Sequence, residues 1–202
     1  MAPEPLEETQ TATERILEAA QEVFAAEGLE ASLSDIALHA GVGVGSIYRR
    51  FDNKNDLIQE LAERRFASLV ERMSAGLEDT DPWEAFSAEF RRSVAEYAAD
   101  RGFRELVLSR VTGSMGWARG SEPDRLNAAM RKWGAAMESV IGRLITRAQK
   151  SGELRSDVDG SVILQLSIAL QSTAGLAGPG QHEQAISIVL DGLRNPRTGR
   201  RR

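Results

Sequence analysis

Cysteine is absent from this chain of 202 residues, and histidine occurs only twice. Without cysteine there can be no disulfide, no thiolate metal site and no cysteine nucleophile, and the composition suits a reducing cytoplasm. The two histidines, His39 and His182, are far apart in the sequence and give no metal-ligand spacing. We therefore expect no cofactor, no metal and no enzymatic activity.

Long hydrophobic runs are also missing. The most apolar stretch, Val162 to Leu176, is interrupted by polar residues that include Gln165, Ser167, Gln171 and Ser172, and it is too short and polar to span a bilayer. The first ten residues, MAPEPLEETQ, are acidic, contain proline and lack the apolar segment of a targeting peptide. These features predict a cytoplasmic protein without membrane association, beginning with a disordered acidic tail over residues 1–11.

The most informative segment is Ser32 to Lys54, which is typical of two short helices joined by a tight turn. Ser32 and Asp35 have the spacing of a capping box, in which each side chain satisfies a backbone N–H of the other residue. A helix should therefore begin at Leu33. It should end near Gly41, because glycine adopts the positive φ that terminates a helix without a steric penalty.

A second short helix is predicted after Gly43, since the apolar residues Val44, Ile47 and Phe51 recur with helical spacing. Ile47 and Phe51 should pack against the first helix and leave the opposite side outward. That side carries hydroxyl and guanidinium groups, the donors that phosphates and guanine edges accept. Its residues are Ser46, Tyr48, Arg49 and Arg50.

A third helix should start at Asn53, which can cap it with Asp56 three positions later. The ammonium group of Lys54 lies in its first turn. Exposed N–H groups at a helix start, beside a lysine, favour phosphate binding. The segment as a whole therefore predicts a helix-turn-helix that binds double-stranded DNA.

The same residues resemble a known family, the tetracycline-repressor (TetR) family of transcriptional regulators. The resemblance covers about the first quarter of the chain, and further on it depends on the layout of helices and on Gly152 to Arg155. Its matching residues are Thr13 to Ala20, Phe24, Gly28, Ile36, Ala37, Ala40 to Val42, Gly45 to Phe51, and Lys54. The resemblance implies an all-α fold, with an N-terminal three-helix DNA-binding domain followed by a helical ligand-binding and dimerisation domain.

The resemblance also implies roles for individual residues. It makes Gly43 to Arg49 the recognition helix, with Val44, Ser46 and Arg49 nearest the bases. Tyr48, Arg50 and Lys54 would hold phosphates. Val44 departs from the family, where lysine or arginine is common, so it is expected to contact a thymine methyl group. Tyr48 is as well suited to packing as to phosphate contact, and we expect it to do both.

The net charge of −5 is unfavourable for a DNA-binding protein, because neutralisation of phosphates dominates affinity. Acidic residues are concentrated near the N-terminus, however, whereas Arg49, Arg50 and Lys54 are close together. We therefore expect weak non-specific binding and a need for two binding heads in each complex.

The apolar pattern beyond Pro82 predicts helices only. The expected domains are residues 12–54 for DNA binding and 55–194 for effector binding and dimerisation, with a basic tail over 195–202. The expected helices are about 83–99, 103–111, 126–148, 160–174 and 183–193, with a loop over 112–124.

The last two helices are apolar over most of their circumference, so they must be covered on two sides. We expect one side to face the domain core and the other to pair with a second copy in a four-helix homodimer interface. The alternative is a buried hairpin in a monomer. The interface residues expected are Leu166, Leu170, Ile186, Val189 and Leu193.

Aromatic and methionine side chains of the middle helices have two interpretations. Taken singly, each is better explained as filling a helical core. The family resemblance implies that some of them line a site for a small, largely apolar effector. The residues considered are Phe86, Phe90, Tyr97, Phe103, Met115, Trp117, Met130, Trp133 and Met137.

The function expected is that of a homodimeric repressor that binds a palindromic operator and is released by its effector. A helical dimeric adaptor, or an activator without effector release, is the alternative. Residues Gly41 to Ser46 resemble a phosphate-binding loop, but no lysine follows and no strand precedes them, so ATP binding is not expected.

Overall fold

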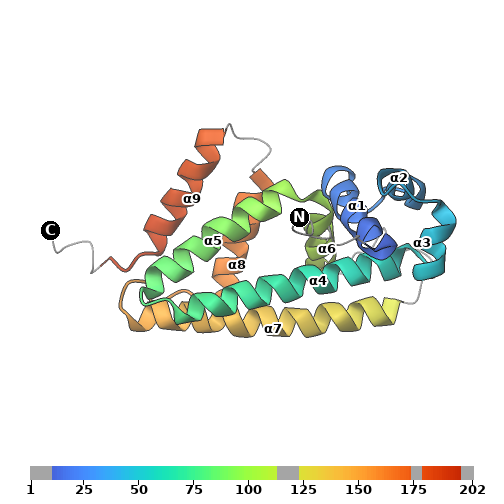
Figure 1. Ribbon diagram of the computed structural model, residues 1–202. Helices are drawn as coiled ribbons and strands as arrows, with labels where there is room; N and C mark the ends of the chain where they lie inside the picture. Colours follow the sequence, from blue (N-terminus) through green and yellow to red (C-terminus); the bar gives the residue numbers. More distant parts are fainter. Residues whose placement is uncertain (1–10, 113–122, 174–178, 197–202) are drawn as a thin grey trace, which may run out of the picture. The chain divides into compact units, whose positions relative to one another are not determined.

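The computed structural model describes residues 11–112, 123–173 and 179–196, and helices make up nearly all of these ranges (Figure 1). The only extended pairing there is an isolated bridge between Leu154 and Arg194. The expected all-α fold is confirmed. The predicted tails, apart from the short parts within these ranges, and most of the loop expected over 112–124 lie outside the described residues.

The helices divide between two compact units. Among the described residues, the first unit contains 11–61, 101–112 and Pro123, and the second contains 62–100, 124–173 and 179–196. The division falls inside one long helix, α4 (Lys54–Ala75), and it groups α6 (Arg101–Thr112) with the N-terminal helices. The domain boundaries expected from the sequence put residues 101–112 in the effector domain instead, because apolar spacing does not show which unit a helix joins.

The first unit is built on α1 (Ala12–Glu27), α2 (Leu33–His39), α3 (Val44–Arg50), the start of α4, and α6. A capping box formed by Thr11 and Glu14 starts α1, and Gly28 ends it with a φ of 88°. One apolar stripe of α1 is buried. Its residues are Ile16, Leu17, Ala20, Val23 and Phe24.

Tight packing between α6 and α1 explains why α6 belongs to the first unit. Gly102 lies so close to α1 that an added Cβ would stand 2.8 Å from the Phe24 carbonyl oxygen. This contact joins residues almost eighty positions apart, and apolar spacing along the chain carries no information about it.

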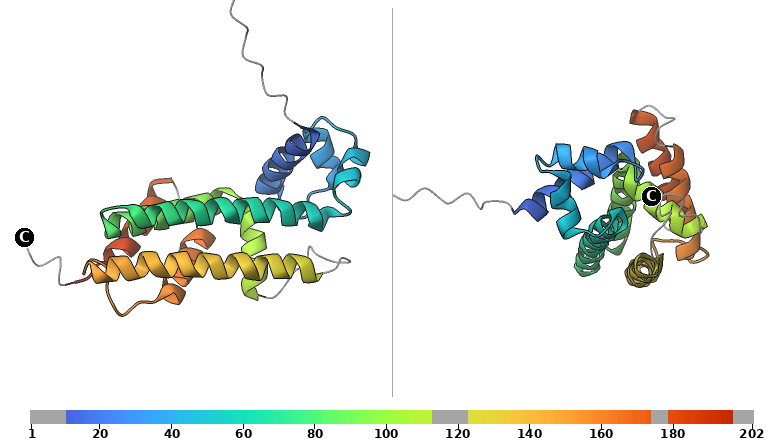
Figure 2. Two further views of the ribbon diagram at one scale, coloured as in Figure 1. Left: turned by 60° about the horizontal axis from the view of Figure 1, so that its bottom comes forward. Right: turned by 90° about the vertical axis from the view of Figure 1, so that its right-hand side faces the viewer.

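The second unit contains the rest of α4, the short 3-10 helix η1 (Gly76–Glu78), α5 (Pro82–Ala99), α7 (Pro123–Lys150), α8 (Gly160–Thr173) and α9 (Pro179–Leu193). The second half of α4 lies along α7, as both Figure 1 and Figure 2 show. Met73 and Leu77 there pack with Val140 and Leu144 of α7. Helix α9 begins four residues before the predicted start, at a proline whose fixed φ suits the first helical position.

A larger core joins α5, α7, α8 and α9 in the second unit. Trp83, Phe86 and Phe90 form a tilted aromatic row on α5, with ring centroids 5.8 and 6.2 Å apart. Apolar residues of α8 and α9 close this core from the other side, among them Leu170 and Ile186. The aromatic residues of α5 therefore form the centre of the second unit.

Candidate nucleic-acid interface

The helix-turn-helix forms through local contacts that the sequence predicts. The Ser32 hydroxyl accepts from the Asp35 backbone N–H at 3.1 Å, and the Asp35 carboxylate accepts from the Ser32 N–H at 3.3 Å. Gly41 has a φ of 64° and makes the turn after α2. The predicted capping box and the glycine turn are confirmed, and they place α3 at a defined position against α2.

The orientation of α3 is set by two buried side chains. Ile47 is completely buried and Phe51 nearly so, which turns the opposite side of α3 outward as predicted. Tyr48 is 56% exposed, and both Arg49 and Arg50 are exposed. Two further residues with an expected DNA role, Val44 and Ser46, are half-buried on the same helix. The structure therefore brings five of the six predicted DNA-binding residues together on one short helix.

The two arginines have different partners. The Arg49 guanidinium donates to the Ser46 hydroxyl at 2.6 Å, so these two groups form one polar unit on α3. Arg50 lies 4.9 Å from the centroid of the Phe51 ring and 3.6 Å from the Glu60 carboxylate of α4. Arg49 is thus held on the recognition helix itself, whereas Arg50 is directed to the junction of α3 and α4.

Lys54, the sixth residue, occupies the first turn of α4, which Asn53 caps. The Asn53 side-chain oxygen accepts from the backbone N–H groups of Asn55 and Asp56 at 2.8 and 3.1 Å. The Lys54 ammonium lies 5.9 Å from the centroid of the Phe24 ring. Burial lowers the pKa of Lys54 below its usual value, and the nearby carboxylates of the first unit partly offset this effect.

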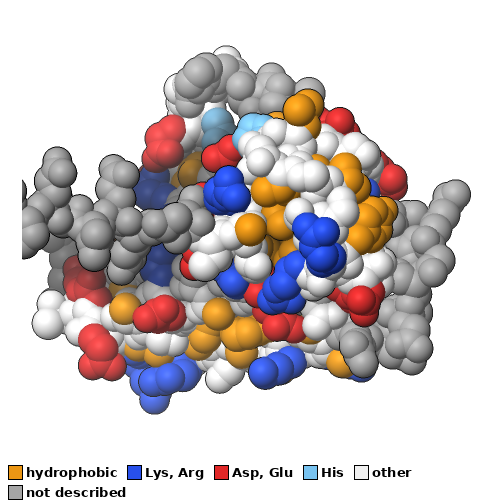
Figure 3. All heavy atoms as spheres, turned by 45° about the vertical axis from the view of Figure 1, so that its right-hand side comes forward, with side chains coloured by type: hydrophobic (Ala, Val, Ile, Leu, Met, Phe, Trp, Pro, Cys, Tyr) orange, Lys and Arg blue, Asp and Glu red, His pale blue; other side chains and the backbone are white. Residues whose placement is uncertain are grey.

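The surface of this part of the molecule is electrically mixed. Figure 3 shows lysine and arginine side chains that lie among hydrophobic and acidic ones rather than in one continuous basic area. This pattern agrees with the net charge of −5 and with the expectation of modest affinity for DNA in general.

The residues considered for effector binding are distributed over both units. Phe86 and Phe90 are buried together in the large core, and Tyr97 is half-buried further along α5. Trp133 and Met137 are half-buried on α7, where Met137 packs against the smaller core. The remaining members are more scattered. Phe103 is buried in the first unit, Met130 is on α7, and Met115 and Trp117 lie outside the described residues.

Two buried polar side chains on α8 were not among the residues predicted to bind the effector. Ser167 and Gln171 are both buried, and the Gln171 amide donates to the Ser167 hydroxyl at 2.8 Å. They share the inward face of α8 with Ile163 and Leu170. The available signal was a serine and a glutamine four positions apart in a helix of largely apolar residues.

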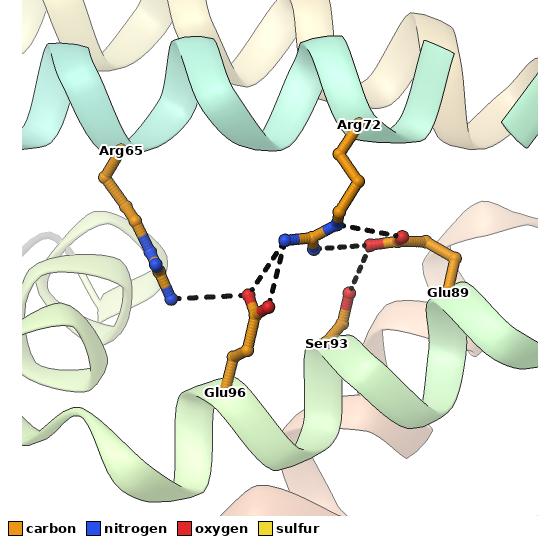
Figure 4. Close-up of polar contacts among 5 residues, drawn as sticks. All are labelled: Arg65, Arg72, Glu89, Ser93 and Glu96. Atoms are coloured by element: carbon orange, nitrogen blue, oxygen red, sulfur yellow. Dashed lines mark hydrogen bonds and ion pairs between the residues drawn. The ribbon is translucent and has the colours of Figure 1, made fainter. Parts of the chain in front are cut away.

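A network of charges that the sequence analysis did not predict joins α4 to α5 (Figure 4). Arg72 donates to the carboxylates of Glu89 and Glu96, and Arg65 donates to Glu96 at 3.3 Å. Hydrogen bonding to Glu89 raises the pKa of Arg72, so the guanidinium stays charged. One signal was present in the sequence, because both the arginines and the glutamates are spaced by seven residues, or two helical turns.

The residues expected at a dimer interface contribute mainly to the core of a single chain. Leu170, Ile186 and Leu193 are buried in the large core, and Leu166 and Val189 pack against it while half-buried. The exposed apolar side chains of α8 and α9 are different residues. They are Val162, Leu164 and Ile188, which are 38%, 49% and 63% exposed.

Two further features of the described residues bear on function. They contain no group of three histidine, cysteine, aspartate or glutamate side chains arranged to hold a metal ion. None of the helices in the described ranges is long and apolar enough to cross a membrane.

A capped helix-turn-helix with an outward Arg49–Ser46 pair, followed by a separate helical unit, defines a DNA-binding transcriptional regulator. Comparisons with known proteins identify the family. Residues 16–61 match the model for bacterial regulatory proteins of the tetR family, and residues 81–195 match the C-terminal domain of SbtR-like transcriptional regulators. The chain belongs to the tetR family, whose members are regulators of transcription and not enzymes.

Three relatives illustrate this membership. The HTH-type transcriptional repressor KstR2 of Rhodococcus jostii is 28% identical, over 97% of this chain and 99% of that protein. The crystal structure of a TetR regulatory protein from Mycobacterium vanbaalenii is 32% identical, with a TM-score of 0.62 over 91% of this chain and 95% of that one. FadR from Bacillus subtilis, solved in complex with stearoyl-CoA, has the same fold at 20% identity, with a TM-score of 0.62 over 88% of this chain and 97% of that one.

Proposed function

We propose that this protein is a homodimeric repressor that binds a palindromic operator in the cytoplasm and releases it when a largely apolar effector binds. The observation that carries the proposal is the outward Arg49–Ser46 pair on α3, which is positioned by buried Ile47. A short helix of this kind reads base edges in the major groove.

Within this proposal the residues of the first unit divide by the part of DNA they contact. Arg49 and Ser46 face base edges, because their side chains are already joined on the outward side of α3. Val44, which is half-buried beside them, offers an apolar contact to a thymine methyl. Tyr48, Arg50 and Lys54 contact phosphates, since they flank this group on α3 and at the start of α4.

Selection from random duplex DNA tests this division. Arg49→Ala should lower the preference for the selected sequence by about 1–3 kcal/mol at one base position. Lys54→Ala should instead weaken operator and random DNA alike and reduce the salt slope by about one. If both variants lose the two kinds of DNA equally, the assigned roles are wrong. If the wild-type protein enriches no sequence, the adaptor alternative is favoured.

Dimerisation is proposed through the outward faces of α8 and α9. Helix α8 contains no charged residue at all, and Leu164 is half exposed on it, as is Ile188 on α9. Depletion of charge is the property that distinguishes the centre of a protein interface. The predicted interface residues Leu166 and Val189 are half-buried and pack against the large core, to which the more deeply buried members of the set belong.

Substitution of the exposed residues tests the dimer. Ile188→Glu, which adds a charge to this face in each copy, should convert the dimer to a monomer at micromolar concentration in light scattering. Leu164→Glu should act in the same way. Ala135→Glu, on an exposed part of α7, is the matched control and should remain dimeric. A wild-type monomer, or variants as dimeric as the control, would refute this interface.

The second unit is proposed to bind the effector, because its centre is an aromatic row on α5, and α8, which packs on α5, carries a buried polar pair. FadR, a protein of the same fold, was solved with a ligand that carries a long acyl chain. A dimer must hold its recognition helices about 34–36 Å apart to reach successive major grooves. An effector that binds better to a dimer whose recognition helices stand at another separation lowers the affinity for the operator. The decrease equals the difference between its affinities for the DNA-binding state and for the other state of the dimer.

Tryptophan fluorescence provides the test of effector binding, since Trp83 belongs to the aromatic row. Titration with a library of apolar compounds should give a saturable change for at least one of them. The same compound should dissociate the selected operator at matching concentrations. No saturable response in the whole library, or binding that leaves the operator complex intact, would contradict release by an apolar effector and would favour the alternative without release.

A further inference from the structure

Glu105 on α6 makes contacts at the junction of α1 and α2 that local sequence does not explain. One carboxylate oxygen accepts from the Leu29 backbone N–H at 2.8 Å, and the other accepts from the Arg101 guanidinium at 2.9 Å. Leu29 is in the turn between α1 and α2. The carboxylate therefore satisfies a backbone donor of the segment that leads into the helix-turn-helix.

This carboxylate lies in a narrow space that exists because the neighbouring residue at the end of α1 is a glycine. A Cβ on Gly28 would lie 2.6 Å from one oxygen of Glu105, and the φ of 88° at this position also disfavours other residues. On the same helix as Glu105, Gly102 allows equally close approach to the Phe24 carbonyl. Two glycines thus permit α6 to bring a charged group directly against the end of α1.

This arrangement places a negative charge near Lys54. The Lys54 ammonium lies over the Phe24 ring, and Glu30 and Glu105 are the two carboxylates whose charges act on it most. Both raise the pKa of Lys54 against the effect of burial. The ammonium group that is proposed to hold a DNA phosphate therefore lies within the electric field of two carboxylates of its own chain.

We propose that Glu105 is a positioning residue for DNA binding, which holds the α1–α2 turn through the Leu29 N–H and weakens the attraction of Lys54 for DNA phosphates. The inference depends on the proposed phosphate contact of Lys54. Its physical basis is that a phosphate attracted by the Lys54 ammonium would at the same time be repelled by a nearby carboxylate of like charge.

Glu105→Gln separates charge from hydrogen bonding, since the amide oxygen can still accept from the Leu29 N–H. We expect this variant to bind operator and random DNA about three-fold more tightly at low salt, with the gain decreasing as salt rises. Combining it with Lys54→Met should remove most of the gain. Glu27→Gln, at the exposed end of α1, has the same change in net charge and is the matched control.

Two measurements without DNA complete the test. Nuclear magnetic resonance titration of the Lys54 side chain should show a lower pKa in Glu105→Gln than in the wild type, because a carboxylate that raises it is gone. The Leu29 amide should exchange its hydrogen roughly ten-fold faster in Glu105→Ala than in Glu105→Gln, since only alanine removes the acceptor. Both results would support the positioning role.

Several outcomes would overturn the inference. These are unchanged or weaker DNA binding by Glu105→Gln, a gain equal to that of Glu27→Gln, a gain that persists without Lys54, or an unchanged Lys54 titration. Failure of the proposed operator function would appear separately, as a wild-type protein that prefers no sequence. The change in random-DNA affinity caused by Glu105→Gln would still be measurable in that case.

Discussion

Replacing Arg72 with methionine should destabilise the second unit, because this guanidinium is the centre of the network between α4 and α5. Three of its nitrogen atoms donate to Glu89 and Glu96, at distances of 2.8 to 3.3 Å. The Glu89 side chain is only 13% exposed and Arg72 is 23% exposed. Removal of one partner from a fully buried pair costs about 3–5 kcal/mol, mainly because the other charge is left uncompensated, and the cost is smaller here because this pair is only partly buried.

Two contacts that remain in the variant reduce this cost. Glu89 still accepts from the Ser93 hydroxyl at 3.0 Å, and Glu96 keeps its ion pair with Arg65. We therefore expect Arg72→Met to lower the free energy of unfolding by about 2–3 kcal/mol. The double variant Arg72→Met with Glu89→Met removes the uncompensated charge and should cost only about 1 kcal/mol.

Urea unfolding followed by circular dichroism and fluorescence provides the measurement. All proteins should be compared at one concentration, since the stability of the proposed dimer would depend on concentration. Arg131→Met, on an exposed position of α7, is the control for loss of an arginine and should be close to wild type. The reasoning is refuted if Arg72→Met lowers the free energy of unfolding by less than 1 kcal/mol. It is also refuted if the double variant loses as much stability as the single variants Arg72→Met and Glu89→Met together.

Three further outcomes are expected. Gly102→Ala should separate α6 from α1 and lower the melting temperature of the first unit, because its Cβ would meet the Phe24 carbonyl oxygen at 2.8 Å; an unchanged melting temperature would show that the contact can relax. Ser32→Ala removes the cap of α2 and should cost about 1 kcal/mol in urea unfolding, whereas Ser32→Thr should retain most of it. The hydrogen bond from Arg155 lowers the pKa of Asp157, so the stabilisation from this pair is present at neutral pH and is lost as the pH falls through the lowered pKa. Arg155→Met should raise the pKa of Asp157 in a carbon-13 titration. An unchanged pKa would contradict the assignment.

The parts of the DNA-binding region that could be predicted from sequence depend on contacts within a few residues. The cap of α2, the turn at Gly41 and the inward side of α3 follow from hydrogen bonds and apolar spacing across three to five positions. The joined Arg49–Ser46 pair is also local, since it spans one turn of helix. For this reason the sequence predicted the recognition helix and its outward residues closely.

Features that join distant segments could not be predicted in the same way. Helix α8 is apolar on nearly all sides, so the sequence did not show which side faces the core, and the exposed Leu164 and Ile188 were missed. Phe103 was considered with the effector residues, but its helix packs on α1 in the first unit. Periodicity defines the faces of a helix and leaves open which neighbour each face meets.

By itself, the sequence determined where most helices begin and end and which short helix presents arginine and serine outward, because these depend on caps, glycines and spacing inside one element. Only the tertiary structure decided that α6 reaches the end of α1, that Glu105 accepts from Leu29, and that Arg72 joins two glutamates of α5. These contacts link residues 17 to 78 positions apart. They form only once packing has brought their helices together, and no local preference of the chain specifies that arrangement.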